Sequence, residues 1–277
     1  MKFTIDIEYA SYLSKRLSEL EKEIGNASDI FEPLAKEKRI IMREFLKYNN
    51  KEKRKLLTTK KWKAVSEKAL NYMQYEEIRS DGVGFDINKF LDVFNKIKLK
   101  KDIVLDYAFD FTESGAIPLP YTRKKNSPKI TPFRYIKLYG YGFDAKPYLK
   151  DIIVQNDPES FFQLVIFSNI VHNFYRKWHA YWYDYKFIFN FDNVEEIFLS
   201  IQDFKGNSEF EDKYREKLMK ISLQSFVEIN DNGAECICIM FSKFIGFYHF
   251  YSTITYPNLS IKNKKETIIP FDIGYRM

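Results

Sequence analysis

Apolar residues in the first hundred positions recur at three- and four-residue steps, the spacing of one face of an α-helix. The first such stripe is Leu13, Leu17, Leu20 and Ile24, and Gly25-Asn26 is expected to end that helix. Similar spacing predicts helices over residues 33–46, 62–73 and 86–97. We therefore expect a helical region over residues 1–100.

The pattern changes at Asp102. From Ile103 to Phe111 large apolar residues occupy every second position, which predicts a half-buried strand. The next segment, Thr112 to Pro132, holds four prolines, so we expect a long loop. A short strand is expected from Tyr135 to Tyr139.

Asp157, Pro158 and Glu159 form a helix-start signal ahead of a strongly apolar segment. We expect this helix to run to about Trp178 or Tyr183 and the chain to become extended at 185–189. Helices over 193–201 and 209–221 should follow.

The last quarter reads as β-structure. Two apolar stretches, 225–230 and 234–241, flank Asp231-Asn232-Gly233, which is a hairpin signal. Further strands are expected over 244–255, 259–261 and 267–271. The predicted fold class is α+β: a helical N-terminal region packed on a mixed or mostly antiparallel sheet, with one long buried central helix. Residues 1–100 and 101–277 should share one core.

Composition restricts the class of protein. Hydrophobic content is 45% and charged content 30%, which is ordinary for a soluble globular protein. The N-terminus carries Asp6 and Glu8 where a secretory signal would be apolar, and the most apolar segment, 161–171, is too short to span a bilayer. The two cysteines, Cys236 and Cys238, should point to one strand face as buried thiols, which favours a reducing compartment. We expect a cytoplasmic protein that does not bind membranes.

The charge of +6 is unevenly distributed. Residues 1–150 hold 31 Lys and Arg against 21 Asp and Glu, and the excess concentrates between Lys36 and Lys63. Such a segment suits either nucleic acid or an acidic protein, and it is equally the pattern of solvent-facing helices.

A polar stripe marks the expected central helix: Asn169, His172, Asn173, Arg176 and His179. His172 and His179 lie two turns apart, roughly 10.5 Å along the axis, too far to bind one metal on a straight helix. Imidazole and guanidinium groups in this order would suit a metal-independent RNase, although the spacing is shorter than in the helical RNases that it resembles. The alternative is a satisfied polar groove.

Three carboxylates, Asp102, Asp106 and Asp110, occupy one face of the predicted strand. Such a row suits a two-metal site or a hydrated strand face. The chain has no P-loop, no C-x-x-C pair and no G-x-S-x-G motif, and the G-x-G at Gly140 is not followed by a third glycine. We expect no cofactor and no metal.

Nine of the seventeen residues from Phe174 to Asn190 are aromatic, where the average composition would give about three. Most of this run should be core, and Tyr181, Trp182 and Tyr183 are candidates for a binding surface together with Asn169. Basic residues beside aromatic ones suggest nucleic-acid contacts. These candidates are Trp62 and the loop residues Arg123, Lys124 and Lys125.

Trp178-His179-Ala180 and the aromatic segment Phe244-Ile245-Gly246-Phe247-Tyr248 resemble immunity proteins of bacterial toxin systems. No residue's role transfers from this resemblance. It implies a non-enzymatic macromolecule-binding protein, with a protein partner favoured over nucleic acid. The alternative is a nucleic-acid-binding protein or an RNase that uses His172, Arg176 and His179.

Overall fold

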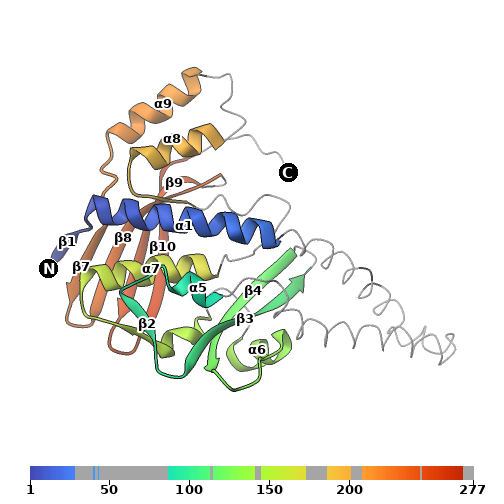
Figure 1. Cartoon of the computed structure of the whole chain (residues 1–277). Helices are drawn as coiled ribbons and strands as arrows, with labels where there is room; N and C mark the ends of the chain where they lie inside the picture. Colours follow the sequence, from blue (N-terminus) through green and yellow to red (C-terminus); the bar gives the residue numbers. More distant parts are fainter. Residues whose placement is uncertain are drawn as a thin grey trace, which may run out of the picture.

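The computed structural model describes residues 1–28, 40, 43, 87–112, 115–140, 145–172, 186–200, 208–243 and 245–270 (Figure 1). Helices and antiparallel sheets make up these ranges, so the α+β class is confirmed. None of the helices within these ranges is long and apolar enough to cross a membrane.

The largest sheet has six antiparallel strands in the order β1-β7-β8-β9-β10, with β6 beside β8. The strands are β1 (Lys2–Thr4), β6 (Lys186–Ile188), β7 (Phe226–Asn230), β8 (Gly233–Ser242), β9 (Gly246–Thr255) and β10 (Ser260–Ile269). β7 pairs with the first half of β8 and β6 with the second half. The hairpin predicted between β7 and β8 is confirmed, because Asn230 pairs with Gly233 across a two-residue turn.

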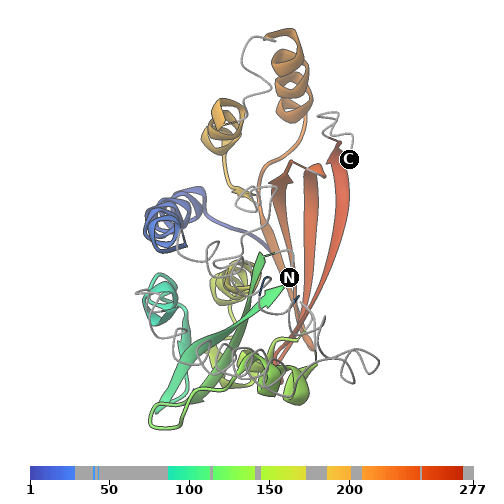
Figure 2. The same ribbon diagram turned by 90° about the vertical axis from the view of Figure 1, so that its right-hand side faces the viewer.

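One face of this sheet is the main core. Its buried side chains come from alternate positions of β8 and β9: Ala234, Cys236, Cys238, Met240, Tyr248, Phe250 and Ile254. Helices α1 (Ile7–Ser28) and α7 (Pro158–Val171) lie on this side of the sheet (Figure 2).

The start of α7 is confirmed. The Asp157 carboxylate accepts a hydrogen bond from the Ser160 N–H at 3.0 Å, and Pro158 occupies the first turn. Ten residues of this 14-residue helix are buried. The expected continuation to Trp178 or Tyr183 lies outside the described residues.

A second core cluster lies at one end of the opposite face. There α8 (Phe191–Ser200) and α9 (Ser208–Met219) cover Ile239, Phe241 and Phe247. The Arg215 guanidinium joins the two helices through two hydrogen bonds, of 2.8 and 2.5 Å, to the Glu195 carboxylate.

The main core cluster includes side chains from both parts of the expected division. Phe90 stacks on Phe167 with ring centroids 5.7 Å apart, and Leu13 belongs to the same cluster as Phe250. The boundary at residue 100 stays a prediction.

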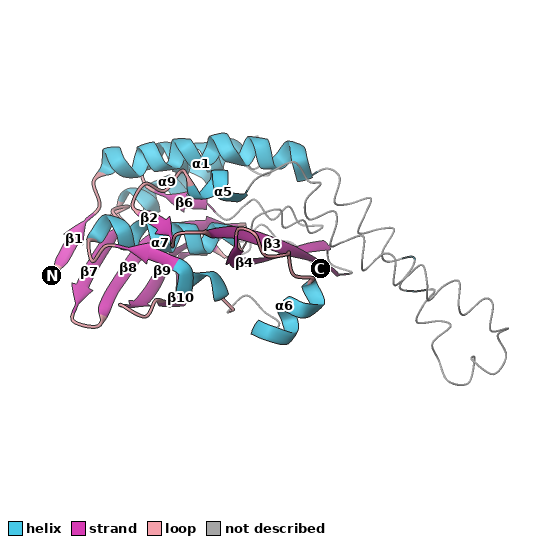
Figure 3. Cartoon of the chain, turned by 60° about the horizontal axis from the view of Figure 1, so that its bottom comes forward, coloured by secondary structure: helices cyan, strands magenta, loops and turns pink. Residues whose placement is uncertain are grey.

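The remaining elements form a smaller unit beside α7, which we call the hairpin unit (Figure 3). It consists of α5 (Ile87–Leu91), β2 (Ile97–Leu99), β3 (Ile103–Thr112), β4 (Gly115–Lys124), α6 (Pro132–Tyr139), the 3-10 helix η1 (Pro147–Asp151) and β5 (Ile152–Val154). β3 pairs with β4 and β2 with β5, both antiparallel. A small apolar cluster of Ala108, Leu119, Tyr121 and Tyr135 fixes α6 to the hairpin.

The strand predicted after Asp102 is confirmed as β3, but the long proline loop is wrong. Its first half is the strand β4, in which Pro118 faces Phe109 and Pro120 faces Tyr107. Because these prolines are two residues apart, both missing N–H groups lie on the same edge of the strand. That edge points away from β3, and β4 has no second neighbour in its sheet, so no ladder bond is lost.

The strand predicted at Tyr135 to Tyr139 is also wrong, since this segment is the helix α6. Thr131 caps it by accepting from the Arg134 N–H at 3.2 Å, and Pro132 fits the first turn. Tyr135 and Tyr139 lie one helical turn apart on α6, and their ring centroids are 5.1 Å apart.

Three boundaries differ as well. Helix α1 continues through Gly25-Asn26 to Ser28, and Ile97 lies in strand β2 rather than in a helix. The two strands expected at 259–261 and 267–271 are one strand, β10, because Lys262 to Glu266 lie at an exposed sheet edge where charged side chains remain hydrated. The helices expected over 33–46 and 62–73 lie outside the described residues.

Candidate functional site

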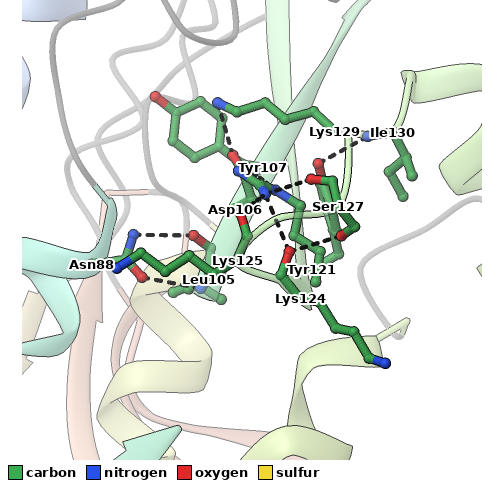
Figure 4. A network of polar contacts seen from close by, with 11 residues as sticks. Asn88, Leu105, Asp106, Tyr107, Tyr121, Lys124, Lys125, Ser127, Lys129 and Ile130 are labelled. Atoms are coloured by element: carbon green, nitrogen blue, oxygen red, sulfur yellow. Dashed lines mark hydrogen bonds and ion pairs between the residues drawn. The ribbon is translucent and has the colours of Figure 1, made fainter. Parts of the chain in front are cut away.

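The Asp106 carboxylate is the centre of a polar network on β3 (Figure 4). Its side chain is only 6% exposed. One oxygen, Oδ2, accepts from Arg123 Nε at 2.7 Å, and the other, Oδ1, lies 3.3 Å from Lys129 Nζ. Oδ1 also accepts from the Tyr107 backbone N–H at 2.9 Å. Two cations therefore share one buried carboxylate.

Arg123 connects this carboxylate to the turn that follows β4. Its Nη1 donates to the carbonyl oxygens of Lys124, Lys125 and Ser127 at 3.3, 3.0 and 2.7 Å. A guanidinium has several donors in a fixed planar arrangement, so one side chain can hold both an anion and several carbonyl groups. Arg123 thus fixes the backbone of the turn and is only 18% exposed.

Lys129 and Tyr121 complete the buried side of the turn. Burial lowers the pKa of Lys129, while the Asp106 carboxylate nearby favours the charged form. Burial, together with the negative charge of Asp106, raises the pKa of Tyr121, whose hydroxyl therefore stays protonated and accepts from the Ile130 N–H at 3.0 Å. The net effect is an anchored turn.

The other side of β3 is anchored by Asn88 of α5. Its side-chain oxygen accepts from the Leu105 N–H at 3.0 Å, and its amide donates to the Leu105 carbonyl at 3.2 Å. The network around Asp106 is therefore fixed to the main core as well as to the hairpin.

Five exposed lysines surround the same end of the hairpin: Lys100, Lys101, Lys124, Lys125 and Lys150. We call them the hairpin lysines. Lys124 pairs with Ile103 across the hairpin, and the Lys125 N–H donates to the Asp102 carbonyl at 2.9 Å, so the turns at both strand ends are adjacent. Figure 4 shows the side chains of Lys124 and Lys125 pointing away from Asp106 in different directions.

Lys100 and Lys150 are connected at the 3-10 helix η1. Lys100 Nζ lies 3.5 Å from Asp151 Oδ1 and donates to the Lys150 carbonyl at 2.5 Å. Lys150 Nζ in turn lies 5.8 Å from the ring centre of Tyr139. This contact extends the basic surface toward α6, where Arg134 and Lys137 are exposed.

The charge of the hairpin unit is strongly positive. Its described residues between 96 and 151 include twelve Lys and Arg against four Asp. Asp106 is paired with Arg123 and Lys129, and Asp151 is close to Lys100 and accepts from the Thr122 hydroxyl at 2.6 Å. Within the described part of the chain, Lys101, Lys124 and Lys125 have no ion-pair partner.

Of the sequence candidates in this region, Lys124 and Lys125 are exposed, whereas Arg123 has a structural role. Sequence reasoning did not identify Lys100, Lys101 and Lys150 as members of the same surface. Lysine pairs at 100–101 and 124–125 were a detectable signal, but only the β3–β4 register shows that they are adjacent.

Of the three aspartates expected in one row, Asp102 lies outside the strand, and the side chain of Asp110 is outside the described part of the structure. Asp102 precedes β3 with a left-handed φ of 61°, and Asp106 is occupied by its cations. No group of three or more His, Cys, Asp or Glu side chains suited to a metal occurs in the described ranges.

The central polar stripe is described only in its first part. Asn169 is half-buried on α7, and His172 is 7% exposed directly after α7. His172 lies against Tyr148 with ring centroids 5.5 Å apart, and its Nε2 and the Tyr148 hydroxyl have no hydrogen-bond partner among the described residues. Burial, followed by the positive charge of Lys146, lowers the pKa of His172 to about 3. A buried neutral imidazole is poorly placed to exchange protons with an external substrate.

The other members of that stripe, Arg176 and His179, lie outside the described residues, as do Trp62, Tyr181, Trp182, Tyr183 and the basic segment 36–63. Cys236 and Cys238 are buried free thiols with sulfur atoms 3.6 Å apart, as the shared strand face predicted.

Comparison with known proteins does not indicate a function, so the functional proposal rests on the geometry of the structure. No family model, no curated protein and no solved structure matches this chain.

Proposed function

We propose that this chain is a non-enzymatic macromolecule-binding protein and that the hairpin lysines contact an anionic partner. The observation that supports this proposal is the division of roles among neighbouring cations. Arg123 and Lys129 pair with the buried Asp106, while Lys124 and Lys125 are exposed on the turn that Arg123 holds. A fixed backbone that presents charged side chains loses little conformational entropy on binding.

The proposed function belongs to the class expected from the sequence, a non-enzymatic macromolecule-binding protein. The proposed binding surface differs, because Lys100, Lys101 and Lys150 join Lys124 and Lys125 in it. A neutralising role of the immunity type, and a cytoplasmic location, remain compatible proposals. An RNase that uses His172 is less well supported, because that imidazole is buried and its pKa is lowered to about 3.

A protein partner at the large sheet is a second candidate. Phe226, Ile237 and Tyr251 are half-buried on the side of the sheet opposite α7, among exposed charged residues such as Glu235 and Lys262. Together with Ser252, Thr253 and other neighbours, Glu235, Tyr251 and Lys262 line a shallow cavity of about 250 Å³. Half-buried aromatic residues surrounded by charges are common in protein interfaces, and they are also common on the hydrated face of antiparallel sheets.

Retention on heparin-agarose tests the first candidate. The double variant Lys124→Glu/Lys125→Glu should elute at clearly lower salt than the unchanged protein, since two cations become anions at the proposed surface. The matched control Lys262→Glu/Lys264→Glu makes the same charge change on β10, in the large sheet. Equal losses in the two variants, or no loss in the first, would reject the hairpin lysines as the binding surface.

A further inference from the structure

We infer that the hairpin lysines bind the phosphodiester backbone of a nucleic acid rather than the acidic side chains of a protein. This inference rests on the proposed function and names the partner of the same surface. It concerns residues 100–101, 124–125 and 150, which belong to three segments of the chain brought together by the hairpin and by η1.

The composition of the surface favours phosphate. Protein interfaces are depleted in lysine and enriched in aromatic residues and arginine, whereas lysine is a common point-charge contact to phosphate. Among the described residues between 96 and 151, the exposed cations are seven lysines and one arginine, and helix α6, which holds Arg134 and Lys137, contains no Asp or Glu. Exposed positive side chains therefore lie both at this end of the hairpin and on α6.

The balance of positive and negative charges around the hairpin lysines also favours phosphate as the ligand. The five lysines, Arg123 and Lys129 are seven cations against Asp102, Asp106 and Asp151. Since Asp106 and Asp151 are both engaged by cations and by hydrogen bonds, they offer few free acceptor sites to compete with a ligand. An anionic backbone is attracted to such a surface without matching donors and acceptors.

The dimensions agree with contacts to several phosphates. Cross-strand neighbours lie about 5 Å apart and consecutive Cα atoms about 3.8 Å apart, so the Cα atoms of Lys100, Lys101, Lys124 and Lys125 extend over roughly 13 Å. A duplex carries one charge per about 1.7 Å of axis, so on the order of seven phosphates fall within this span. Lysine stems are flexible, which lets side chains that leave the turn in different directions reach separate phosphates. Contacts of this type carry no base-sequence information.

The dependence of affinity on salt measures phosphate contacts directly. Fluorescence anisotropy with a labelled DNA duplex of about 20 base pairs, over a salt series, gives a slope of log K against log salt concentration. Each lost contact should reduce that slope by about 0.9 for duplex and about 0.7 for a single strand. For Lys124→Ala/Lys125→Ala we expect a reduction of about 1.8 with duplex, and binding weaker by tens of fold near 0.1 M salt.

The same titration with a single-stranded oligonucleotide distinguishes the two forms of nucleic acid, and poly-glutamate serves as the acidic-protein probe. Lys262→Ala/Lys264→Ala removes two charges from β10 and should leave the DNA slope unchanged. Thermal unfolding of each variant verifies that the fold is retained.

The possible results distinguish a failure of the nucleic-acid inference from a failure of the proposed function. A reduced DNA slope in Lys124→Ala/Lys125→Ala alone supports the inference. An unchanged slope, or the same reduction in the β10 control, overturns it. Hairpin-dependent binding of poly-glutamate without DNA binding overturns the inference but leaves the proposed function intact, and unaltered heparin retention of the charge-reversed variant removes both.

Discussion

Burial of His172 predicts that this protein loses stability as the pH falls below about 6.5. In the folded chain the imidazole is 7% exposed, and burial and Lys146 lower its pKa to about 3. In the unfolded chain it has the ordinary pKa of 6.5. Between these values the unfolded state binds a proton that the folded state does not bind, so acid favours unfolding.

The size of the effect follows from the two pKa values. Each unit of pKa difference corresponds to about 1.4 kcal/mol, and the loss accumulates as the pH falls from 6.5 toward 3. At pH 5 the contribution of His172 is about 2 kcal/mol, a large share of the roughly 5–15 kcal/mol that stabilises a typical domain. Well above pH 6.5 the imidazole is neutral in both states and contributes no pH dependence.

Urea denaturation at several pH values between about 7.5 and 5 measures this contribution. The variant His172→Phe keeps an aromatic ring beside Tyr148 and removes the titrating group. The unfolding free energy of the unchanged protein should fall by about 2 kcal/mol more than that of His172→Phe over this range.

His249, half-buried on the opposite face of the sheet, provides a histidine control, and His249→Gln should retain the steeper pH dependence that depends on His172. Parallel loss of stability in the unchanged protein and His172→Phe would refute the reasoning. So would an NMR titration in which the His172 ring becomes protonated near pH 6.

Three further predictions concern the fold. Asp106→Asn should cost roughly 3–5 kcal/mol in urea denaturation, because Arg123 and Lys129 lose their buried carboxylate, whereas the exposed Asp102→Asn should cost far less; similar costs would contradict the network. Gly233→Ala should lower the melting temperature strongly, because φ is 140° and a Cβ would collide with the Ile254 carbonyl oxygen; an unaltered melting temperature would contradict this turn geometry. Ellman's reagent should modify Cys236 and Cys238 slowly in the native protein and rapidly in denaturant, and fast native reaction would show that the thiols are accessible.

The sequence by itself determined the elements whose signals are local. The Asp231-Asn232-Gly233 turn, the capped start of α7 at Asp157 and the alternation in β3 each depend on a few consecutive residues, and each is found in the structure. Local reasoning failed where one signal has two meanings. Prolines at 118 and 120 indicate a loop unless their missing donors face an unpaired strand edge, and only the sheet topology shows that they do.

Tertiary structure alone decided the roles of the charged residues. The sequence assigned Asp106 to a row of carboxylates and Arg123 to a binding loop, but the β3–β4 register places them 2.7 Å apart although 17 positions separate them. A cation is either buried in an ion pair or exposed to a partner, depending on its desolvation and on its distance from an anion. The pairing of β3 with β4 sets both quantities, and the neighbouring residues in the sequence do not. The same pairing leaves Lys124 and Lys125 exposed beside Lys100 and Lys101. The chain thus specified its strands and helices locally, and the long-range register of the hairpin determined which of its many lysines form a surface.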